Sequence, residues 1–139
     1  MIKLSRNLKI FSLLFILYTI SFRYFLSLSI TNHNHVVQWA TAIIYGVTIF
    51  ITALVLGKSE DINIGVIYLG FKYHLMTYVI FNVITLLWHS LGFVSQYEDF
   101  SRVLLLLVVW GIGLLIHFLL SQHSSKNAIK GVPKEDIFD

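Results

Sequence analysis

Four stretches of the chain are long and apolar enough to cross a membrane, and this constrains its fold more than anything else in it. They lie at about residues 10–30, 36–56, 68–91 and 103–121. A bilayer core about 30 Å thick needs roughly 20 apolar residues per helix. Lipid cannot hydrogen-bond free backbone groups, so such segments fold as helices. All seven acidic residues lie outside the four stretches. The sequence therefore predicts an all-α polytopic membrane protein with four transmembrane helices.

The composition excludes several other classes of protein. Of the 139 residues, 57% are hydrophobic and only 12% are charged, whereas a soluble domain carries about 25% charged residues. A soluble chain of this length could not bury so much apolar surface. The basic residues sit at helix ends and form no patch, so we expect no nucleic-acid partner. Without cysteine there is no disulfide, thiolate metal site or cysteine nucleophile. The lipid bilayer is the predicted surrounding.

The distribution of lysine and arginine predicts the topology. Eight of the ten would lie on one side of the membrane, namely Lys3, Arg6, Lys9, Lys58, Lys72, Lys126, Lys130 and Lys134. The positive-inside rule then makes both termini cytoplasmic. The first apolar run resembles a signal peptide, but it contains Arg23 and ends without a small-residue cleavage site, so we predict an uncleaved helix. Short loops between the spans predict an antiparallel up-down-up-down bundle over residues 1–121, followed by a short cytoplasmic tail over 122–139.

Polar residues recur on one face of every predicted helix. The four sets are Ser12, Thr19, Arg23 and Ser27; Thr41, Tyr45, Thr48 and Thr52; His74, Tyr78, Asn82, Thr85 and His89; and Trp110, Gly113, His117 and Ser121. Apart from one spacing of seven, neighbours within a set are three or four residues apart, which places each set on one helical face. Small and hydroxylated residues favour contact between membrane helices. We expect these faces to meet one another or a partner.

Arg23 is the one clear charge inside a predicted span. A guanidinium at this depth is costly and needs a partner or a route to water. Snorkelling to the external headgroups is one reading, since Arg23 lies about seven residues, or roughly 10 Å, from the span's external end. Contact with an anion, a lipid headgroup or a partner subunit is the other. A small channel or transporter that uses Arg23 is an alternative function on this basis.

His74 and His117 are predicted to lie at similar depth on adjacent helices, roughly 6–9 Å below the cytoplasmic boundary. Three interpretations stay open for this pair. The two rings are structural hydrogen-bonding groups, or they sense pH or a ligand, or they ligate a b-type haem in an electron-transfer subunit. Gly111 and Gly113 could clear space for a haem macrocycle, or could serve close helix packing. No cofactor is the primary expectation.

Three further histidines lie near the external loops. His33 and His35 flank Asn34 in the first loop, and His89 ends the third span. Three imidazoles could bind zinc or copper, but no carboxylate in the first loop supplies a further ligand. We therefore expect solvated histidines and no metal site.

The third and fourth spans carry a pattern of spaced polar and aromatic residues. It consists of Phe71, His74, Tyr78 and Asn82 at intervals of three, four and four, and then Trp110, Gly111, Gly113 and His117. Over about residues 67–122 this resembles the bacterial two-transmembrane (2TM) domain family. Its turn often carries tryptophan and proline, whereas this chain has Glu98 to Arg102 there. The resemblance implies a non-enzymatic module, found alone or attached to signalling proteins, with these residues from His74 onward as its signature.

Taken together, the patterns predict no enzyme, because no set of nucleophile, base and orienting residue can be drawn. The expected function is that of a non-enzymatic integral inner-membrane protein, a signalling accessory or a subunit of a larger membrane complex. The expected partners are other membrane subunits or further copies of the chain.

Overall fold

The computed structural model describes residues 5–58 and 66–130, with side chains described over 5–58 and 70–123. Its four helices are α1 (Arg6–Thr31), α2 (His35–Lys58), α3 (Val66–Ser90) and α4 (Phe100–Lys130). The prediction of an all-α chain with four helices is confirmed. Helix α4 continues past residue 121, where the sequence predicted a tail, because residues 122–130 contain neither glycine nor proline. The rest of that tail, 131–139, lies outside the described residues.

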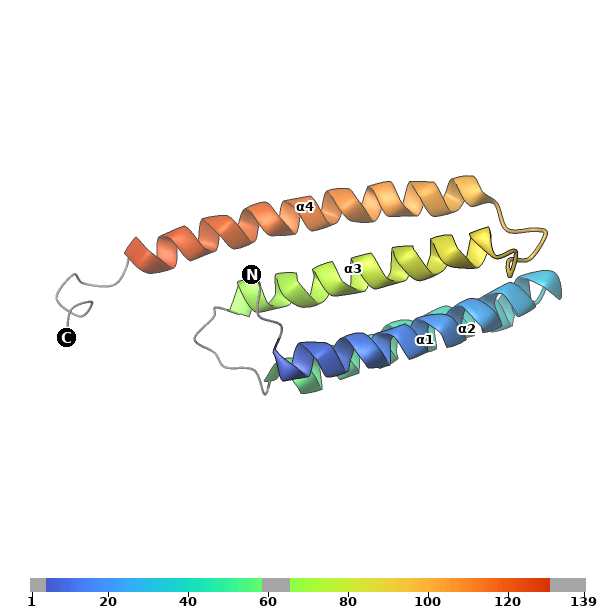
Figure 1. Cartoon of the computed structure of the whole chain (residues 1–139), viewed down its shortest axis with the longest axis horizontal. Helices are drawn as coiled ribbons and strands as arrows, with labels where there is room; N and C mark the ends of the chain where they lie inside the picture. Colours follow the sequence, from blue (N-terminus) through green and yellow to red (C-terminus); the bar gives the residue numbers. More distant parts are fainter. Residues whose placement is uncertain (1–4, 59–65, 131–139) are drawn as a thin grey trace.

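Successive helices run in opposite directions, but they form a more open arrangement than the predicted bundle (Figure 1). Helix α1 packs against α2 on one side and α3 on the other, and α3 also packs against α4. Among the described residues, no Cα atom of α4 comes within 8 Å of α1 or α2. The fourth helix is therefore attached along one seam only, and α1 and α3 are the central helices.

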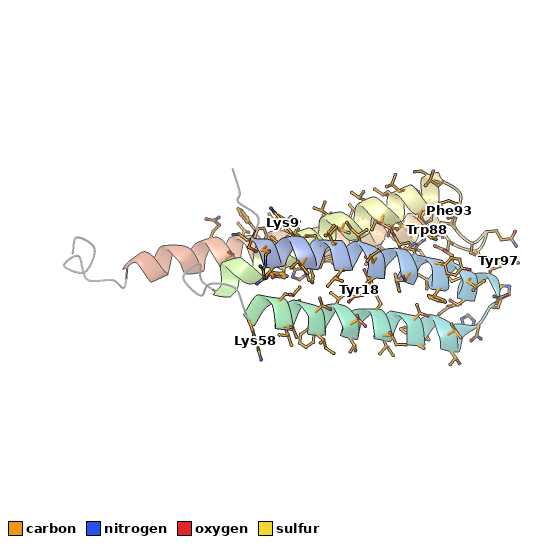
Figure 2. The ribbon with its side chains drawn as sticks, turned by 60° about the horizontal axis from the view of Figure 1, so that its bottom comes forward. Lys9, Tyr18, Lys58, Trp88, Phe93 and Tyr97 are labelled. Atoms are coloured by element: carbon orange, nitrogen blue, oxygen red, sulfur yellow. The ribbon has the colours of Figure 1, made fainter. Side chains whose placement is uncertain are left out.

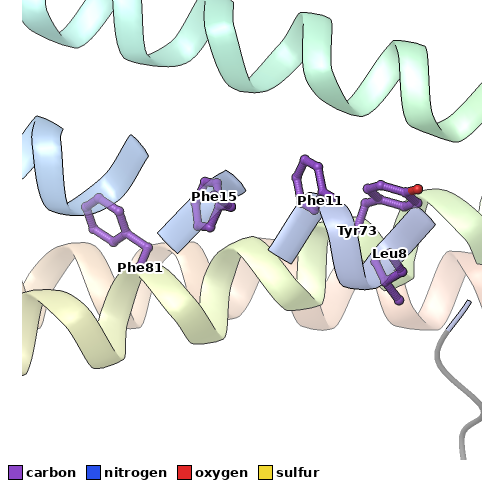
Figure 3. Close-up of a cluster of buried hydrophobic side chains, with 5 residues drawn as sticks. All are labelled: Leu8, Phe11, Phe15, Tyr73 and Phe81. Atoms are coloured by element: carbon purple, nitrogen blue, oxygen red, sulfur yellow. The ribbon is translucent and has the colours of Figure 1, made fainter. Parts of the chain in front are cut away.

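The apolar core lies where α1 meets α3 (Figure 3). It consists of Leu8, Phe11 and Phe15 from α1, with Tyr73 and Phe81 from α3. The α1 residues recur every three or four positions, so they share one helical face. Phe11 stacks edge-on against Tyr73, with ring centroids 4.8 Å apart. This aromatic contact holds α1 against the first half of α3.

Most of the apolar surface faces outward. Helix α2 has no buried residue, and large side chains along α4, such as Leu105, Val109 and Leu119, are exposed. Among the described residues, three segments are long and apolar enough to cross a membrane: α1, α2 and Phe100–His123 within α4. Helix α3, the remaining predicted span, is not among them. It carries Lys72, His74, Asn82 and His89, the polar residues that lower its hydropathy.

The predicted polar faces of α1 and α2 meet. Thr19 is fully buried, and its hydroxyl lies 2.9 Å from the hydroxyl of Tyr45 on α2. Asn82, Thr85 and Ser121 are buried as well, whereas His74 and Gly113 are exposed. Most positions of the predicted polar faces therefore turn inward within the chain, whereas these two do not. Both lie on an exposed side of the α3–α4 pair, which we call the open edge.

Two turns close the end of the molecule at which α1 and α3 finish. Figure 2 shows Trp88, Phe93 and Tyr97 at this end, and Lys9 and Lys58 at the opposite one. The Asn34 side chain caps α2 by accepting a hydrogen bond from the Val37 N–H. Asp99 caps α4 in the same way through Ser101. Hydrogen bonds from the Ser101 hydroxyl and N–H lower the pKa of Asp99. The second turn thereby acquires a fixed geometry.

Candidate functional site

A buried ion pair joins the first helix to the loop between α3 and α4. An Nη atom of Arg23 lies 2.6 Å from a carboxylate oxygen of Glu98, and the two side chains are only 4% and 7% exposed. Arg23 is placed there by its position on the inner face of α1, four residues after Thr19 and four before Ser27. The chain therefore supplies its own counter-charge for Arg23.

Glu98 is the centre of a wider polar network. Its second carboxylate oxygen accepts a hydrogen bond from the Ser27 hydroxyl at 2.6 Å and a longer one from the Ser95 N–H at 3.4 Å. The Ser27 hydroxyl in turn accepts one from the Trp88 indole at 3.2 Å. His89 lies 3.8 Å from the carboxylate. Helix α1, the end of α3 and the second loop are thus tied together at one carboxylate.

This network changes the interpretation of Arg23. The sequence offered snorkelling, an external anion or a partner subunit, and Glu98 was assigned no role with it. Glu98 lies 75 residues away in a loop, where helical periodicity carries no information. The available signal was electrostatic: a buried guanidinium needs a counter-charge, and Glu98 and Asp99 are the acidic residues of the predicted external loops.

A cleft of about 440 Å³ opens beside the ion pair, between α1 and α4. All four helices and both turns contribute to its lining. Its apolar wall includes Phe22, Leu26, Phe81 and Leu106, and its polar rim includes His33, His35, Asp99 and Arg102. The cleft exists because α4 contacts α3 without reaching α1. In a closed bundle, side chains would fill this space.

The predicted histidine pair lies in the seam between α3 and α4. The rings of His74 and His117 are edge-on, with centroids 5.5 Å apart. Trp110 packs edge-on against both His74 and Tyr78. The Tyr78 hydroxyl donates a hydrogen bond to the carbonyl of Leu107 on α4. The structure thus brings His74, Tyr78, Trp110 and His117 together as one aromatic seam.

The remaining positions of that pattern behave differently. The Asn82 amide donates to the Tyr78 carbonyl within its own helix. A Cβ atom at Gly111 would lie 3.0 Å from the Tyr78 hydroxyl, whereas one at Gly113 would meet nothing within 4 Å. Close packing therefore occurs at Gly111 and not at Gly113. Because the Tyr78 side chain lies over Gly111, that glycine serves close helix packing and clears no space for a macrocycle.

Replacing each glycine by alanine separates these two roles. Alanine is favoured over glycine in a helix by about 1 kcal/mol. We expect Gly113→Ala to raise the free energy of unfolding by up to about that amount. At Gly111 the added methyl displaces the Tyr78 hydroxyl, so we expect Gly111→Ala to be less stable than Gly113→Ala by about 1–2 kcal/mol. Unfolding in mixed micelles measures both variants. Equal stabilities would contradict close packing at Gly111.

The external histidines do not gather around a common point. His33 stacks on Tyr97, with ring centroids 4.6 Å apart, and His35 contacts Gln38. His89 lies instead beside Glu98. Among the side chains described, over residues 5–58 and 70–123, no group of three potential ligands has the geometry to hold a metal ion. The alternative of an anion channel gains no support either, because Arg23 is paired with Glu98.

Comparisons of this chain with family models, with curated proteins and with solved structures gave no match. The resemblance of residues 67–122 to the two-transmembrane family therefore stays an expectation. What the structure and the sequence show together is a four-helix chain with several candidate membrane spans, a buried ion pair at one end and an aromatic seam towards the other.

Proposed function

We propose that this chain is a non-enzymatic multi-pass protein of the bacterial inner membrane that works by associating with other membrane helices. It acts as a signalling accessory or as a subunit of a larger membrane complex. Helix α3 is its fourth span, and both termini are cytoplasmic. The Lys and Arg distribution supports this orientation, since Lys9 and Lys58 lie at the end away from the α1–α2 and α3–α4 turns (Figure 2).

The observation that carries this proposal is the open edge of the α3–α4 pair. Helix α4 packs on α3 alone, and His74 is exposed at their seam. Inside a membrane an exposed imidazole would face hydrocarbon, which cannot satisfy its hydrogen bonds. A helix from another chain, laid along this edge, would cover the imidazole. The same edge carries residues of the two-transmembrane pattern, whose family is found attached to signalling proteins.

Site-directed crosslinking tests this edge directly. The chain has no cysteine, so a single introduced cysteine can carry a benzophenone crosslinker. Gly113 on α4 lies on the same face as Trp110 and His117, and Gly46 on α2 is the matched control. Both have open space where a side chain would begin. In native membranes we expect Gly113→Cys to give a discrete protein adduct and Gly46→Cys to give lipid adducts alone.

The mass of the adduct decides between the two kinds of association. A different polypeptide makes the chain an accessory or subunit, whereas a doubled mass makes the edge a contact between copies. Adding His74→Phe to the Gly113→Cys chain should reduce the adduct severalfold, because it removes the exposed imidazole that a partner helix would cover. Lipid adducts alone at both positions would reject association through this edge.

A further inference from the structure

The cleft beside the ion pair has the size and form of a ligand site, and the proposed association does not use it. Its volume of about 440 Å³ falls within the range of roughly 300–1,000 Å³ typical of small-molecule sites. It lies at the end where α1 and α3 finish and α2 and α4 begin. In a membrane this end coincides with the headgroup region of one leaflet.

The lining divides into an apolar wall and a polar rim. The wall consists of side chains from α1, α3 and α4, among them Phe22, Phe81 and Leu106. The rim carries Arg102, His33 from the first turn and His35 at the start of α2. The first turns of α2 and α4 also lie here, and helix N-termini favour negative charge. A ligand with an apolar part and a negatively charged oxygen group matches this division.

Two buried hydrogen-bond donors that line the cleft have no acceptor. Thr85 is only 2% exposed, and its hydroxyl has no hydrogen-bond partner among the described residues. The Nε atom of Arg23, a second buried donor, is likewise without one. Both residues line the cleft. Unpaired buried donors cost about 1–3 kcal/mol each, so an oxygen acceptor entering the cleft would relieve a cost already present in the fold.

Arg102 supplies the guanidinium on the rim of the cleft that a ligand can use. Glu98 is occupied by Arg23 and Ser27, and Asp99 is occupied by the cap of α4. Arg102 forms no ion pair with any residue whose side chain the structure describes. A small soluble anion would be repelled by the two nearby carboxylates and would gain no binding energy from the apolar wall. A phosphate carried on an apolar tail would gain from both regions.

We propose that the cleft binds one glycerophospholipid. Its phosphate lies at the rim beside Arg102 and the first turns of α2 and α4. An ester carbonyl accepts hydrogen bonds on the floor from Thr85 and Arg23, and an acyl chain lies along the apolar wall. In a glycerophospholipid the ester oxygens lie just below the phosphate. In the cleft, the floor with Thr85 and Arg23 likewise lies below the rim with Arg102. Failure of this proposal leaves the association at the α3–α4 edge unaffected.

The experiment titrates lipid-free protein in a maltoside detergent with a short-chain phosphatidylglycerol. The full chain is used, with binding measured by the shift of the unfolding midpoint and by native mass spectrometry. We expect one lipid per chain. Arg102→Gln should weaken binding about tenfold, the loss expected for one charge-assisted hydrogen bond. Lys58→Gln, an exposed cation at the opposite end, should bind like the wild type.

Thr85→Val separates binding from folding, because the two effects have opposite signs. Valine removes an unpaired buried hydroxyl at nearly the same volume, so the lipid-free variant should unfold at the same or a higher temperature. Its affinity for the lipid should fall by roughly fivefold to tenfold. Unchanged lipid affinity in both Thr85→Val and Arg102→Gln would overturn the proposal. Equal stabilisation by glycerol phosphate without acyl chains would also overturn it, in favour of a soluble anion.

Discussion

Glu98→Gln should lower the free energy of unfolding by about 3 kcal/mol or more. The glutamine keeps the size of the side chain but leaves the guanidinium of Arg23 buried without a counter-charge. Removal of one partner from a buried ion pair typically costs 3–5 kcal/mol. Here the carboxylate also accepts hydrogen bonds from Ser27 and Ser95. Reversible unfolding by sodium dodecyl sulfate in mixed micelles measures the loss.

The neighbouring carboxylate provides the matched control. Asp99→Asn makes the same chemical change one residue further on, at an exposed position where the side chain caps α4. Asparagine caps helices about as well as aspartate, so we expect a change within about 0.5 kcal/mol. If Glu98→Gln is as mild as Asp99→Asn, the ion pair does not hold the loop against α1.

A double-mutant cycle identifies the partner. Arg23→Leu removes the cation and Glu98→Leu removes the anion, and each alone leaves one buried charge. The double variant leaves neither, and replacement of a whole buried pair by apolar residues is often close to neutral. We therefore expect it to be more stable than the sum of the two losses predicts, by about 2 kcal/mol or more. Strict additivity would mean that Arg23 pairs elsewhere.

The helices and most of their inner faces could be predicted from the sequence, because both are local properties. A run of about 20 apolar residues forms a helix in lipid whatever surrounds it. Spacings of four placed Thr19, Arg23 and Ser27 on one face, and all three are buried. The same logic predicted that α3 and α4 meet near His74 and His117, whose rings are in contact.

The contacts between distant segments could not be predicted in this way. Periodicity orients a face but does not determine which helix covers it, so the attachment of α4 to α3 alone was not foreseen. Exposure of Gly113 is a consequence of that arrangement. Glu98 lies in a loop, where no repeat indicates the direction of a side chain. Its role depends on a pairing across 75 residues that only the folded chain reveals.

The low hydropathy of α3 follows from its place in the fold. It packs against α1 on one side and α4 on the other, so several of its polar side chains, including Asn82 and Thr85, are buried within the fold. Helices α2 and α4 have fewer neighbours and more apolar surface exposed. A central membrane helix tolerates polar residues that a peripheral one cannot. The shortfall of α3 in hydropathy is therefore compatible with a fourth span.

Single-cysteine labelling gives an all-or-none test of that span. Phe93→Cys lies in the turn after α3, at an exposed position, and Lys58→Cys lies at the exposed end of α2. A membrane-impermeant maleimide applied to cells with a permeabilised outer membrane should label Phe93→Cys at once. Lys58→Cys should react only after the inner membrane is opened, as should Gln122→Cys at an exposed position in the last third of α4.

Each pattern of labelling corresponds to one arrangement of the chain. Because α3 connects Lys58 to Phe93, reaction of both from the same side would mean that α3 does not cross the membrane. The polar face of α3 would then lie along the membrane surface, and the uneven distribution of lysine would not indicate the topology. Reaction of the two from opposite sides, with Gln122→Cys matching Lys58→Cys, requires that both α3 and α4 span the bilayer. The cleft at the Glu98 end would then face the outer leaflet, where its phospholipid must come from.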